Sequence, residues 1–454
     1  MSRVYESLFR HLLFPAWEAA RGRRTLAWLR EYERNQWLDP EQLAALQWRK
    51  LTVLVGHCWD QVPYYRRRWQ ALGFQPGDLK SMADYARLPV LTKTDIRENF
   101  QDLHAGDRRA GLLYKATGGS TGEPLRFGFT RESNDRRIAV MWRGYGWTGA
   151  PLGRRALFLW GGAVGDPSAR TRLKDRLYHG AFHRRMLDSF RMRDDNLGAY
   201  ADAIAAWKPE AIVAYVGPLV RLAQWLVDNG RSIAGVRSVL GAAEALHDFQ
   251  RPMIEAAFPG ARAYNTYGCR EFMLIACECG QRDGLHVNSD HLVVELVDDQ
   301  PAAGGGRTGE LAITDLHNWG MPFIRYVNGD LATTPADPGA RCACGRGLPR
   351  LARIEGRRLD AIRTADGRTL PGEFFPHMLK DVPGVRRFQV VQERLDAVVV
   401  SIVPGPDFGP DQDAYVRREI AKVLGDEAVI ELRRVDDIPL TASGKFRVTV
   451  SRLP

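Results

Sequence analysis

Three features are scarce or absent in this sequence, and each narrows the class of protein. No apolar run reaches the ~20 residues that cross a membrane. Cysteine is rare: there are six in 454 residues, and four of these form two Cys-x-Cys pairs, a spacing that favours metal ligation over a disulfide framework. A long basic block is absent, although basic residues are in excess and the formal net charge is +10. Nucleic acid is therefore not an expected partner, because its binding needs a clustered basic surface.

The N-terminal 24 residues lack the clean apolar core and cleavage site of a secretory signal peptide. Leu12, Leu13 and Phe14 stand among charged residues such as Arg10 and Glu18. We expect an amphipathic helix that packs on its own domain, and a role at a membrane surface is the weaker alternative. The expected compartment is the cytoplasm.

Residues 116–124, with the sequence ATGGSTGEP, hold three glycines and three hydroxyl side chains. Glycine permits sharp turns and close approach, and consecutive backbone N–H groups make a concavity that binds anions. We interpret this stretch as a phosphate-binding loop, with a flexible surface turn as the alternative. It is not the loop of P-loop NTPases, because no Gly-Lys-Ser/Thr follows the glycines.

Strand and helix patterns alternate between residues 155 and 270, which predicts a parallel sheet with right-handed crossovers. The expected strands are 155–160, 211–216, 236–240 and 262–266, and the expected helices start at 217 and 246. Ligands of such sheets bind beyond the carboxyl ends of the strands, where residues 241–244 and 267–271 lie. Residues 1–100 are expected to be mostly helical, with Thr92 or Thr94 capping a helix.

Two other patterns follow along the chain. Residues 290–335 are typical of antiparallel strands, and we expect a small barrel-like region there. A domain boundary is expected near 354–360, because beyond it lie strands 388–392, 397–402 and 429–433 and a helix at 411–424. We predict an α/β fold with a large N-terminal domain, residues 1–356, and a small, mobile α+β C-terminal domain, residues 357–454.

Six short motifs occur in a fixed order along the chain. They are TGGSTGEP at 117–124, GAAE at 241–244, YGCRE at 267–271, YVNGD at 326–330, GRRLD at 356–360 and TASGK at 441–445. With these motifs the chain resembles the adenylate-forming (acyl-CoA synthetase) superfamily, and most of all its phenylacetate–CoA ligase branch with the capsule-biosynthesis relatives. The resemblance covers nearly the whole chain. It implies an AMP-forming ligase that uses ATP to activate a carboxylate as an acyl-adenylate, releases pyrophosphate and transfers the acyl group to CoA.

The resemblance also implies roles for single residues. Lys445 would be the catalytic lysine, with Thr121 and Arg270 beside the reacting phosphate. Glu271 would hold Mg²⁺, a hard cation that prefers carboxylate oxygen, and Asp360 would be the hinge of the C-terminal domain. The residues that would bind ATP are Thr117, Gly118, Gly119, Ser120, Thr121, Gly122, Glu244, Tyr267, Gly268, Asp330 and Arg357. Within this set Glu244 and Tyr267 would border the adenine, and Asp330 would accept hydrogen bonds from the ribose.

One residue departs from the family pattern. Arg270 stands where relatives commonly have threonine or serine before the glutamate. A guanidinium can also bind phosphate, so activity is retained in this interpretation. The departure does weaken a direct transfer of phenylacetate as the substrate.

The cysteines and one histidine form a second constellation. Cys277, Cys279, His286 and the pair Cys342 and Cys344 offer five soft or borderline ligands, and a zinc site needs four. The resemblance favours Cys279, His286, Cys342 and Cys344, with Cys277 in place of Cys279 left open. A site filled by four protein ligands would be structural, and reduced buried thiols are the alternative.

The acid and the acceptor are not readable from the sequence. Trp160, Tyr215 and Val216 lie where strand ends could line an acyl pocket, which suggests an aromatic or other planar acid, although core packing explains them equally well. The acceptor could be CoA or an amine. A non-catalytic nucleotide-binding protein is the second functional class, but such a relative is expected to lose Lys445 and Glu271 first. The oligomeric state, monomer or homodimer, stays open.

Overall fold

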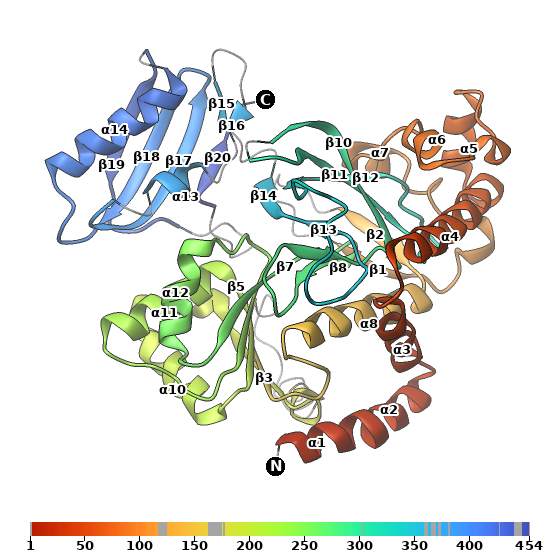
Figure 1. Ribbon diagram of the computed structural model, residues 1–454, viewed down its shortest axis with the longest axis horizontal. Coiled ribbons are helices and arrows are strands. Elements are labelled where there is room, and N and C mark those ends of the chain that lie inside the picture. The colour runs from red at the N-terminus through yellow and green to blue at the C-terminus, as the bar shows by residue number, and fades with distance from the viewer. Residues whose placement is uncertain are drawn as a thin grey trace. The chain divides into compact units, whose positions relative to one another are not determined.

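The computed structural model describes residues 2–116, 125–161, 175, 178–302, 304–357, 362–364, 369–370, 374–379, 382–425, 427–439 and 447–453. The chain divides into two compact units (Figure 1). The first comprises Met1–Asn328 and Thr333–Arg353, and the second Gly329–Ala332 and Ile354–Pro454. None of the described helices is long and apolar enough to cross a membrane.

The first hundred residues are mostly helical, as predicted. The helices are α1 (Ser2–Leu8), a π-helical turn η1 (Phe9–Leu13), α2 (Phe14–Arg21), α3 (Thr25–Asn35), α4 (Pro40–Gln61), α5 (Pro63–Gln70), α6 (Met82–Ala86) and α7 (Lys93–Glu98). Asp39 caps α4 by accepting a hydrogen bond from the Gln42 backbone N–H, and the Gln42 side chain accepts one from the Asp39 N–H. Thr92, rather than Thr94, caps α7 through the same kind of capping box.

An eight-stranded sheet runs through the first unit in the order β13-β9-β8-β7-β6-β5-β3-β4. Its strands are β3 (Ala156–Trp160), β4 (Arg184–Asp188), β5 (Ala211–Tyr215), β6 (Ser238–Ala242), β7 (Arg262–Cys269), β8 (Met273–Glu278), β9 (Leu285–Val287) and β13 (Arg350–Leu351). The pairs β4–β3, β3–β5, β5–β6 and β6–β7 are parallel, which confirms the predicted parallel sheet. The chain reverses after β7, and β8, β9 and β13 extend the sheet in antiparallel pairs.

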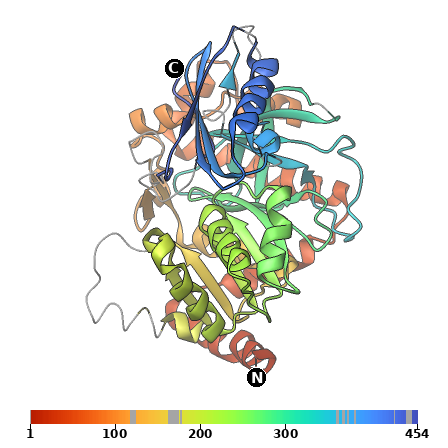
Figure 2. The same ribbon diagram turned by 90° about the vertical axis from the view of Figure 1, so that its left-hand side faces the viewer.

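Three helices pack on the parallel half of this sheet (Figures 1 and 2). They are α10 (Leu197–Trp207), α11 (Val216–Asp228) and α12 (Arg251–Ala257). Leu219, Leu222 and Leu226 of α11 recur at helical spacing and are fully buried against the sheet. The predicted helix at 246 begins later than expected, because a short 3₁₀ turn at Asp248–Gln250 comes first. Helix α12 starts at Arg251, with Pro252 in its first turn.

A second core joins the N-terminal helices to the antiparallel half of the sheet through α8 (Arg131–Trp147). Helix and strand approach closely at Gly144, where an added Cβ would come within 2.3 Å of the Leu274 side chain. The short antiparallel hairpin of β1 (Leu113–Ala116) and β2 (Arg126–Phe129) leads directly into this helix. The start of α8 is therefore tied in sequence to the predicted phosphate loop, which connects the two strands.

Residues 290–335 contain β10 (Leu292–Pro301), β11 (Arg307–Asp315) and β12 (Tyr326–Thr333), which adjoin in this order. The pair β10–β11 is antiparallel, as predicted. The boundary between the units passes through β12, since residues 329–332 belong to the second unit. Closure into a barrel stays a prediction.

The second unit is a small α+β fold built on the sheet β19-β18-β17-β20. Its elements are β14 (Arg353–Arg357), which begins at the unit boundary, β15 (Ile362–Arg363), β16 (Thr369–Leu370), α13 (Phe374–Leu379), β17 (Val385–Arg394), β18 (Ala397–Pro404), α14 (Pro410–Leu424), β19 (Val429–Arg434) and β20 (Thr449–Ser451). Val416 and Ile420 of α14 and Phe375 of α13 pack on the inward residues of the sheet. This is the size and type of domain that the strand and helix pattern predicts.

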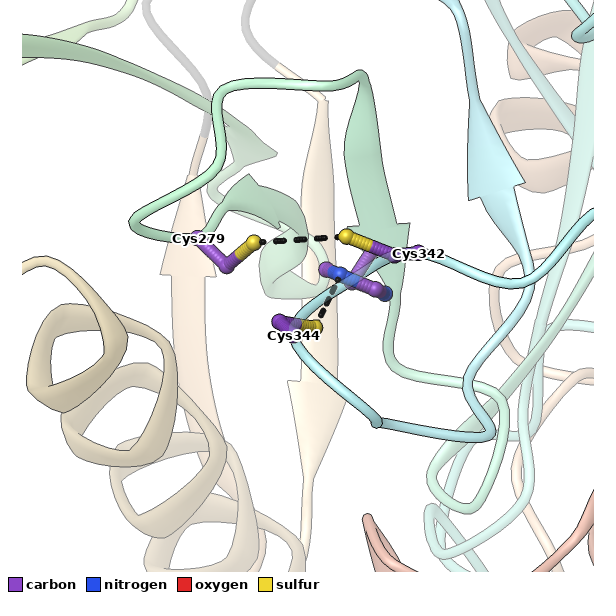
Figure 3. A group of neighbouring side chains, drawn as sticks. Cys279, Cys342 and Cys344 are labelled. Atoms are coloured by element: carbon purple, nitrogen blue, oxygen red, sulfur yellow. Dashed lines mark hydrogen bonds between the residues drawn. The ribbon is translucent and has the colours of Figure 1, made fainter.

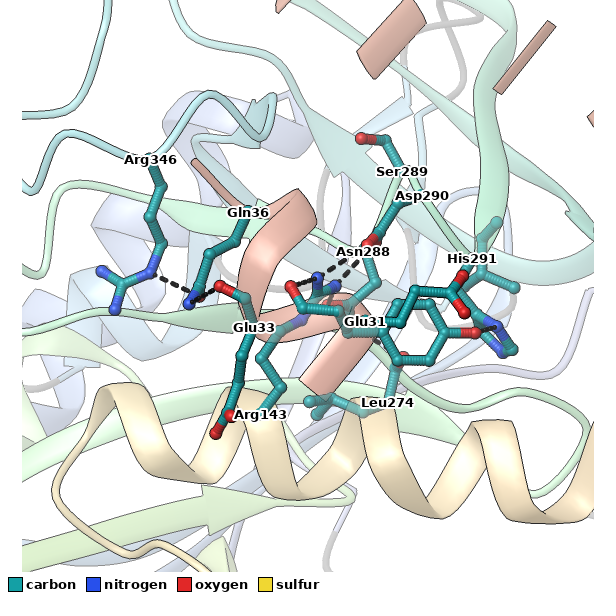
Figure 4. A network of polar contacts seen from close by, with 12 residues as sticks. Glu31, Glu33, Gln36, Arg143, Leu274, Asn288, Ser289, Asp290, His291 and Arg346 are labelled. Carbon is teal, nitrogen blue, oxygen red and sulfur yellow. Dashed lines mark hydrogen bonds and ion pairs between the residues drawn. The ribbon is translucent and has the colours of Figure 1, made fainter. Parts of the chain in front are cut away.

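A buried polar network crosses the first unit beside the β9–β10 turn (Figure 4). The Arg143 guanidinium makes a bidentate ion pair with Asp290 at 2.8 Å and donates to Asn288 Oδ1 and to the Tyr32 carbonyl. The Arg143 and Asp290 side chains are 1% and 0% exposed. The Tyr32 hydroxyl lies 2.9 Å from His291 Nδ1, which extends the network to the start of β10. It links α3, α8 and the β9–β10 turn through groups that water cannot reach.

Candidate active site

The predicted site residues of the first unit gather at the carboxyl ends of β5, β6 and β7. Glu244 follows β6, and its Oε2 accepts a hydrogen bond of 2.5 Å from the Gly217 N–H at the start of α11. Ala243 holds a left-handed backbone with φ of 67°, which a non-glycine residue seldom adopts outside functional or strained turns. Glycine suits position 241 because the Cβ of any other residue would lie only 3.0 Å from Val216 and 3.2 Å from Leu246. The GAAE turn is thus held in a defined shape by its neighbours.

Tyr267 and Gly268 lie near the end of β7, at a bulge in its pairing with β8. The buried Tyr267 hydroxyl accepts a hydrogen bond of 2.7 Å from Asn328 Nδ2. Gly268 must remain glycine, because a Cβ there would come within 1.8 Å of the Met273 carbonyl oxygen. The bulge and the Asn328 contact together fix the position of the Tyr267 ring.

Glu271 lies in the turn between β7 and β8 and is buried. The Tyr326 hydroxyl donates to its Oε1 at 3.2 Å. This leaves a buried carboxylate held in place by a neutral donor, with a second oxygen to offer. The oxygen of such a carboxylate is a suitable ligand for a hard divalent cation.

Arg270 contacts the base of the predicted phosphate loop. Its Nη1 donates a hydrogen bond of 2.7 Å to the carbonyl of Ala116, the last residue of β1. Ala116 pairs with Arg126 across the hairpin, so both strands meet the loop at this point. The residue that departs from the family pattern therefore binds the strand that leads into the loop.

Three cations lie near the open end of this hairpin: Lys115, Arg126 and Arg270. Lys115 and Arg126 project from opposite faces of the hairpin, since Lys115 pairs with Phe127 and Arg126 with Ala116. None of them forms a salt bridge with a carboxylate among the described residues. The Lys115 ammonium lies 4.9 Å above the Phe129 ring. Partial burial lowers the pKa of Lys115, and the charges of Arg137 and Arg270 lower that pKa further. Because the described residues place no carboxylate beside Lys115 or Arg270, these two cations create a positive potential that favours a bound anion.

For most of the other predicted site residues, the structure describes no side chain. Thr117, Gly118, Gly119, Ser120, Thr121, Gly122, Asp360 and Lys445 lie outside the described residues. The backbone of Arg357 ends β14, and its side chain is not described. Asp330 is half-buried in β12, in the segment that belongs to the second unit.

The structure brings the four predicted metal ligands together (Figure 3). One donor atom from each of Cys279, His286, Cys342 and Cys344 lies within 4.8 Å of all the others. The Cys279 and Cys342 sulfurs are 3.7 Å apart, and the Cys344 sulfur is 3.2 Å from His286 Nε2. Tetrahedral zinc with bonds of about 2.0–2.3 Å would separate its ligand atoms by roughly 3.3–3.8 Å. The geometry and the donor types therefore fit a closed zinc site.

The surroundings of the cluster orient its histidine and tune its thiols. His286 Nδ1 lies 3.2 Å from the Leu348 carbonyl, which directs Nε2 toward the cysteines. Burial lowers the pKa of His286 to about 4, so the ring is neutral at pH 7. Burial raises the pKa of Cys279 to about 12. Burial also opposes ionisation of Cys344, but hydrogen bonds from the Arg346 backbone and side chain and from neighbouring thiols outweigh it and lower that pKa.

Cys277 lies outside this group of four side chains. Its sulfur contacts the Gly144 carbonyl at 3.5 Å and the Glu278 carbonyl at 3.3 Å. Burial holds the pKa of the Cys277 thiol well above its usual value. Cys58 is likewise a buried thiol, and Cys269 is half-buried at the end of β7.

Sequence reasoning assigned no role to Asn328, Tyr326, Lys115 or Arg126. Asn328 and Tyr326 belong to the YVNGD motif, so the signal was present, but their contacts with Tyr267 and Glu271 join residues some sixty positions apart. Lys115 and Arg126 flank the glycine-rich loop on both sides. Their position in sequence could have indicated an anion site.

Comparison with known proteins supports the same family as the motifs. Residues 362–452 match the family described as the CapK C-terminal domain. The chain is 28% identical over 418 residues to the phenylacetate-coenzyme A ligase of Thermus thermophilus, covering 86% of each chain. It is 23% identical over 386 residues to protein CapK of Staphylococcus aureus, covering 82% of this chain and 81% of CapK.

The resemblance to adenylate-forming ligases is confirmed. Among solved structures, the chain is similar to 2-hydroxyisobutyryl-CoA ligase in its postadenylation state in complex with R3-HIB-AMP. The TM-score is 0.73 at 22% identity, and 92% of each chain is covered. The two proteins therefore share a fold, with a large α/β portion and a small C-terminal domain.

Proposed function

We propose that this protein is an ATP-dependent, AMP-forming ligase that joins a carboxylic acid to CoA. The observation that carries the proposal is the pair of cations Lys115 and Arg270 at the end of the β1–β2 hairpin, for which the described residues supply no carboxylate partner. It lies beside a glycine-rich loop, where a triphosphate would be neutralised. The order of the six motifs and the similarity to phenylacetate-coenzyme A ligases support the same activity.

The reaction proceeds in two displacements. A carboxylate oxygen attacks the α-phosphorus of ATP, and the bond to the bridging oxygen breaks as pyrophosphate leaves. The CoA thiolate then attacks the carbonyl carbon of the acyl-adenylate, and AMP leaves. Both steps transfer charge between bound groups, so positioning and electrostatic stabilisation supply most of the catalysis.

Residues of the chain have distinct tasks in the first displacement. The loop at 117–122 and the hairpin cations hold the β- and γ-phosphates, and Lys445 stabilises the charge at the α-phosphate and the attacking carboxylate. Tyr267 and Glu244 border the adenine, with Asp330 and Arg357 at the ribose. Glu271 supplies a carboxylate ligand to Mg²⁺, which neutralises phosphate charge when bound.

The acid-binding pocket is proposed at the ends of β3 and β5. The rings of Trp160 and Tyr215 lie 4.4 Å apart between centroids, on neighbouring strands. Burial raises the pKa of Tyr215, with Arg270 lowering and Glu244 raising it, so this tyrosine lies within reach of both charges. Two aromatic walls with a cation nearby suit a planar carboxylic acid.

AMP formation over a panel of carboxylic acids, each with and without CoA and with simple amines, tests the activity. We expect AMP and an acyl-CoA product with at least one acid, and an aryl acid is the first choice. Amide formation without acyl-CoA would establish the amine-ligase alternative. ATP binding without turnover on any acid would favour the non-catalytic alternative.

We propose a structural zinc ion at Cys279, His286, Cys342 and Cys344, which would connect the β8–β9 hairpin to the loop before β13. Protein prepared without chelator should contain about one zinc per chain by elemental analysis. The double variant Cys342→Ser with Cys344→Ser should lose the metal and unfold at a lower temperature. The control Cys269→Ser should keep it. Metal-free wild-type protein, or equal zinc in the double variant, would contradict the site.

We propose that the domain comprising residues 357–454 turns about Asp360 between the two displacements. Proline fixes φ near −65°, so Asp360→Pro should hinder a hinge motion. Adenylate formation should stay largely intact, whereas transfer to CoA should slow by at least roughly tenfold, about 1.4 kcal/mol of barrier. Single-turnover kinetics separates the steps, and Asp360→Ala is the control that leaves φ free. Equal losses in both steps would mean that Asp360 is only a turn or helix-capping residue.

The domain of residues 1–356 would bind ATP and the acid, and the C-terminal domain would carry the catalytic lysine. We propose a cytoplasmic enzyme, either a monomer or a homodimer.

A further inference from the structure

The N-terminal helical segment has a second apolar face that the protein does not cover. Val4, Leu8, Leu12 and Leu13 are 75%, 45%, 60% and 41% exposed. Ala16, Ala19 and Ala20 are exposed farther along α2. The first three positions recur every four residues, so their side chains form one stripe along the helical segment of α1, η1 and α2. Figure 1 shows α1 and α2 of this segment next to the N-terminus.

The opposite face of the segment is firmly anchored. Phe9 and Phe14 are buried and both contact Phe182, with ring centroids 5.2 and 5.7 Å apart. These two phenylalanines are five residues apart. In a regular α-helix, side chains at that spacing point to different faces. The π-turn, in which the Phe14 N–H bonds to the Phe9 carbonyl, brings both inward. Packing of the two phenylalanines therefore fixes the orientation of the segment, with the stripe facing outward.

Charge is distributed unequally over the same segment. Its two carboxylates face the protein: Glu6 pairs with Arg154 at 2.9 Å, and Glu18 accepts hydrogen bonds from the Thr25 and Leu26 N–H groups. On the described part of this segment the exposed charged side chain is that of Arg21, and Arg24 follows it just before α3. Arg10 is half-buried and pairs with Glu33 of α3 at 3.5 Å. The outward surface of the segment itself therefore carries apolar side chains and basic groups but no carboxylate of its own, which makes it complementary to an anionic lipid surface.

We propose that α1, η1 and α2 form a docking surface for an anionic membrane, with the stripe of Val4, Leu8, Leu12 and Leu13 entering the headgroup region. A second copy of the chain fits this surface less well. Four partly exposed side chains offer much less than the ~800 Å² per partner of a stable protein interface, and facing arginines would repel. Docking would hold the proposed ligase beside an acid or an acceptor that resides at a membrane. That consequence rests on the proposed function, but the docking itself does not.

Sedimentation of the full-length protein with vesicles tests the proposal. We expect binding to phosphatidylcholine vesicles that contain about 30 mol % phosphatidylglycerol, weaker binding in high salt, and little binding to pure phosphatidylcholine. The variant Leu8→Glu with Leu12→Glu should reduce the partition coefficient by at least roughly tenfold. Leu72→Glu, which changes a leucine that is 58% exposed outside the segment, is the matched control and should bind normally.

Circular dichroism and thermal unfolding of each variant establish that it is folded, since both substituted leucines are exposed. Absence of binding by the wild type, or equal binding by the double variant, would overturn the proposal. So would a dimer, seen by light scattering, that the same two substitutions dissociate, because the stripe would then be an interface between copies. Failure of the ligase assays would leave the vesicle result unchanged, so the two proposals are tested separately.

Discussion

Lys445→Ala is expected to slow acyl-adenylate formation by about a hundredfold or more, ~2.7 kcal/mol of transition-state stabilisation. The ammonium would lie where charge passes from the attacking carboxylate to the departing pyrophosphate. Alanine removes that preorganised charge from the transition state. Single-turnover quenching with labelled ATP measures the rate, and equilibrium binding of ATP should change little.

A second lysine of the same unit provides the control. Lys422 in α14 pairs with Glu419 at the surface, so Lys422→Ala removes a cation of the same kind without touching the proposed site. Its adenylation rate should match that of the wild type. Equal rates in Lys445→Ala and the wild type would contradict the role assigned to Lys445.

Asp290→Ala is expected to destabilise the first unit by about 3–5 kcal/mol, because it leaves the buried Arg143 guanidinium without its counter-charge. The pair is bidentate and inaccessible to water, so no solvent can replace the lost carboxylate. The midpoint of thermal unfolding, followed by calorimetry, should fall by several degrees.

Asp202→Ala is the matched control for this prediction. Asp202 pairs with Arg231 at the surface, with side chains 69% and 39% exposed, and such pairs contribute less than about 1 kcal/mol. Replacing both partners, Arg143→Met with Asp290→Leu, should recover part of the loss, since no unpaired charge remains. A loss in Asp290→Ala no larger than in Asp202→Ala would show that the pair is not isolated from solvent.

Much of the fold could be predicted because local patterns decide it. The buried strands 155–160 and 211–216, the Gly217–Pro218 helix start and the small C-terminal α+β unit all follow from short-range periodicity and turn chemistry. The reversal after β7 could not be predicted in the same way. It depends on a bulge at Gly268, which a Cβ would block, and no periodicity marks such a contact.

The metal ligands could likewise be predicted only in part from the sequence. The two Cys-x-Cys pairs and one histidine indicated a site, but spacing alone could not choose between Cys277 and Cys279. These residues are two apart across the end of β8, where the strand stops and the backbone turns. Only the three-dimensional path takes Cys279 to Cys342 and leaves Cys277 against α8.

The role of Arg270 also needed the structure. In the sequence it is a substitution beside Glu271 that suggests a direct phosphate contact. In the fold its guanidinium binds the Ala116 carbonyl, 154 positions earlier in the chain. Such long-range contacts leave no trace in composition or spacing, and they are the part of the site that sequence reasoning missed.

Acid-dependent exchange of labelled pyrophosphate into ATP, without CoA, tests the central claim most directly. Exchange requires reversible formation of an acyl-adenylate and needs neither the acceptor nor the second displacement. The account predicts exchange that appears only when a suitable carboxylic acid and Mg²⁺ are both present. Folded, ATP-binding protein that shows no exchange with any acid of a broad panel would contradict it.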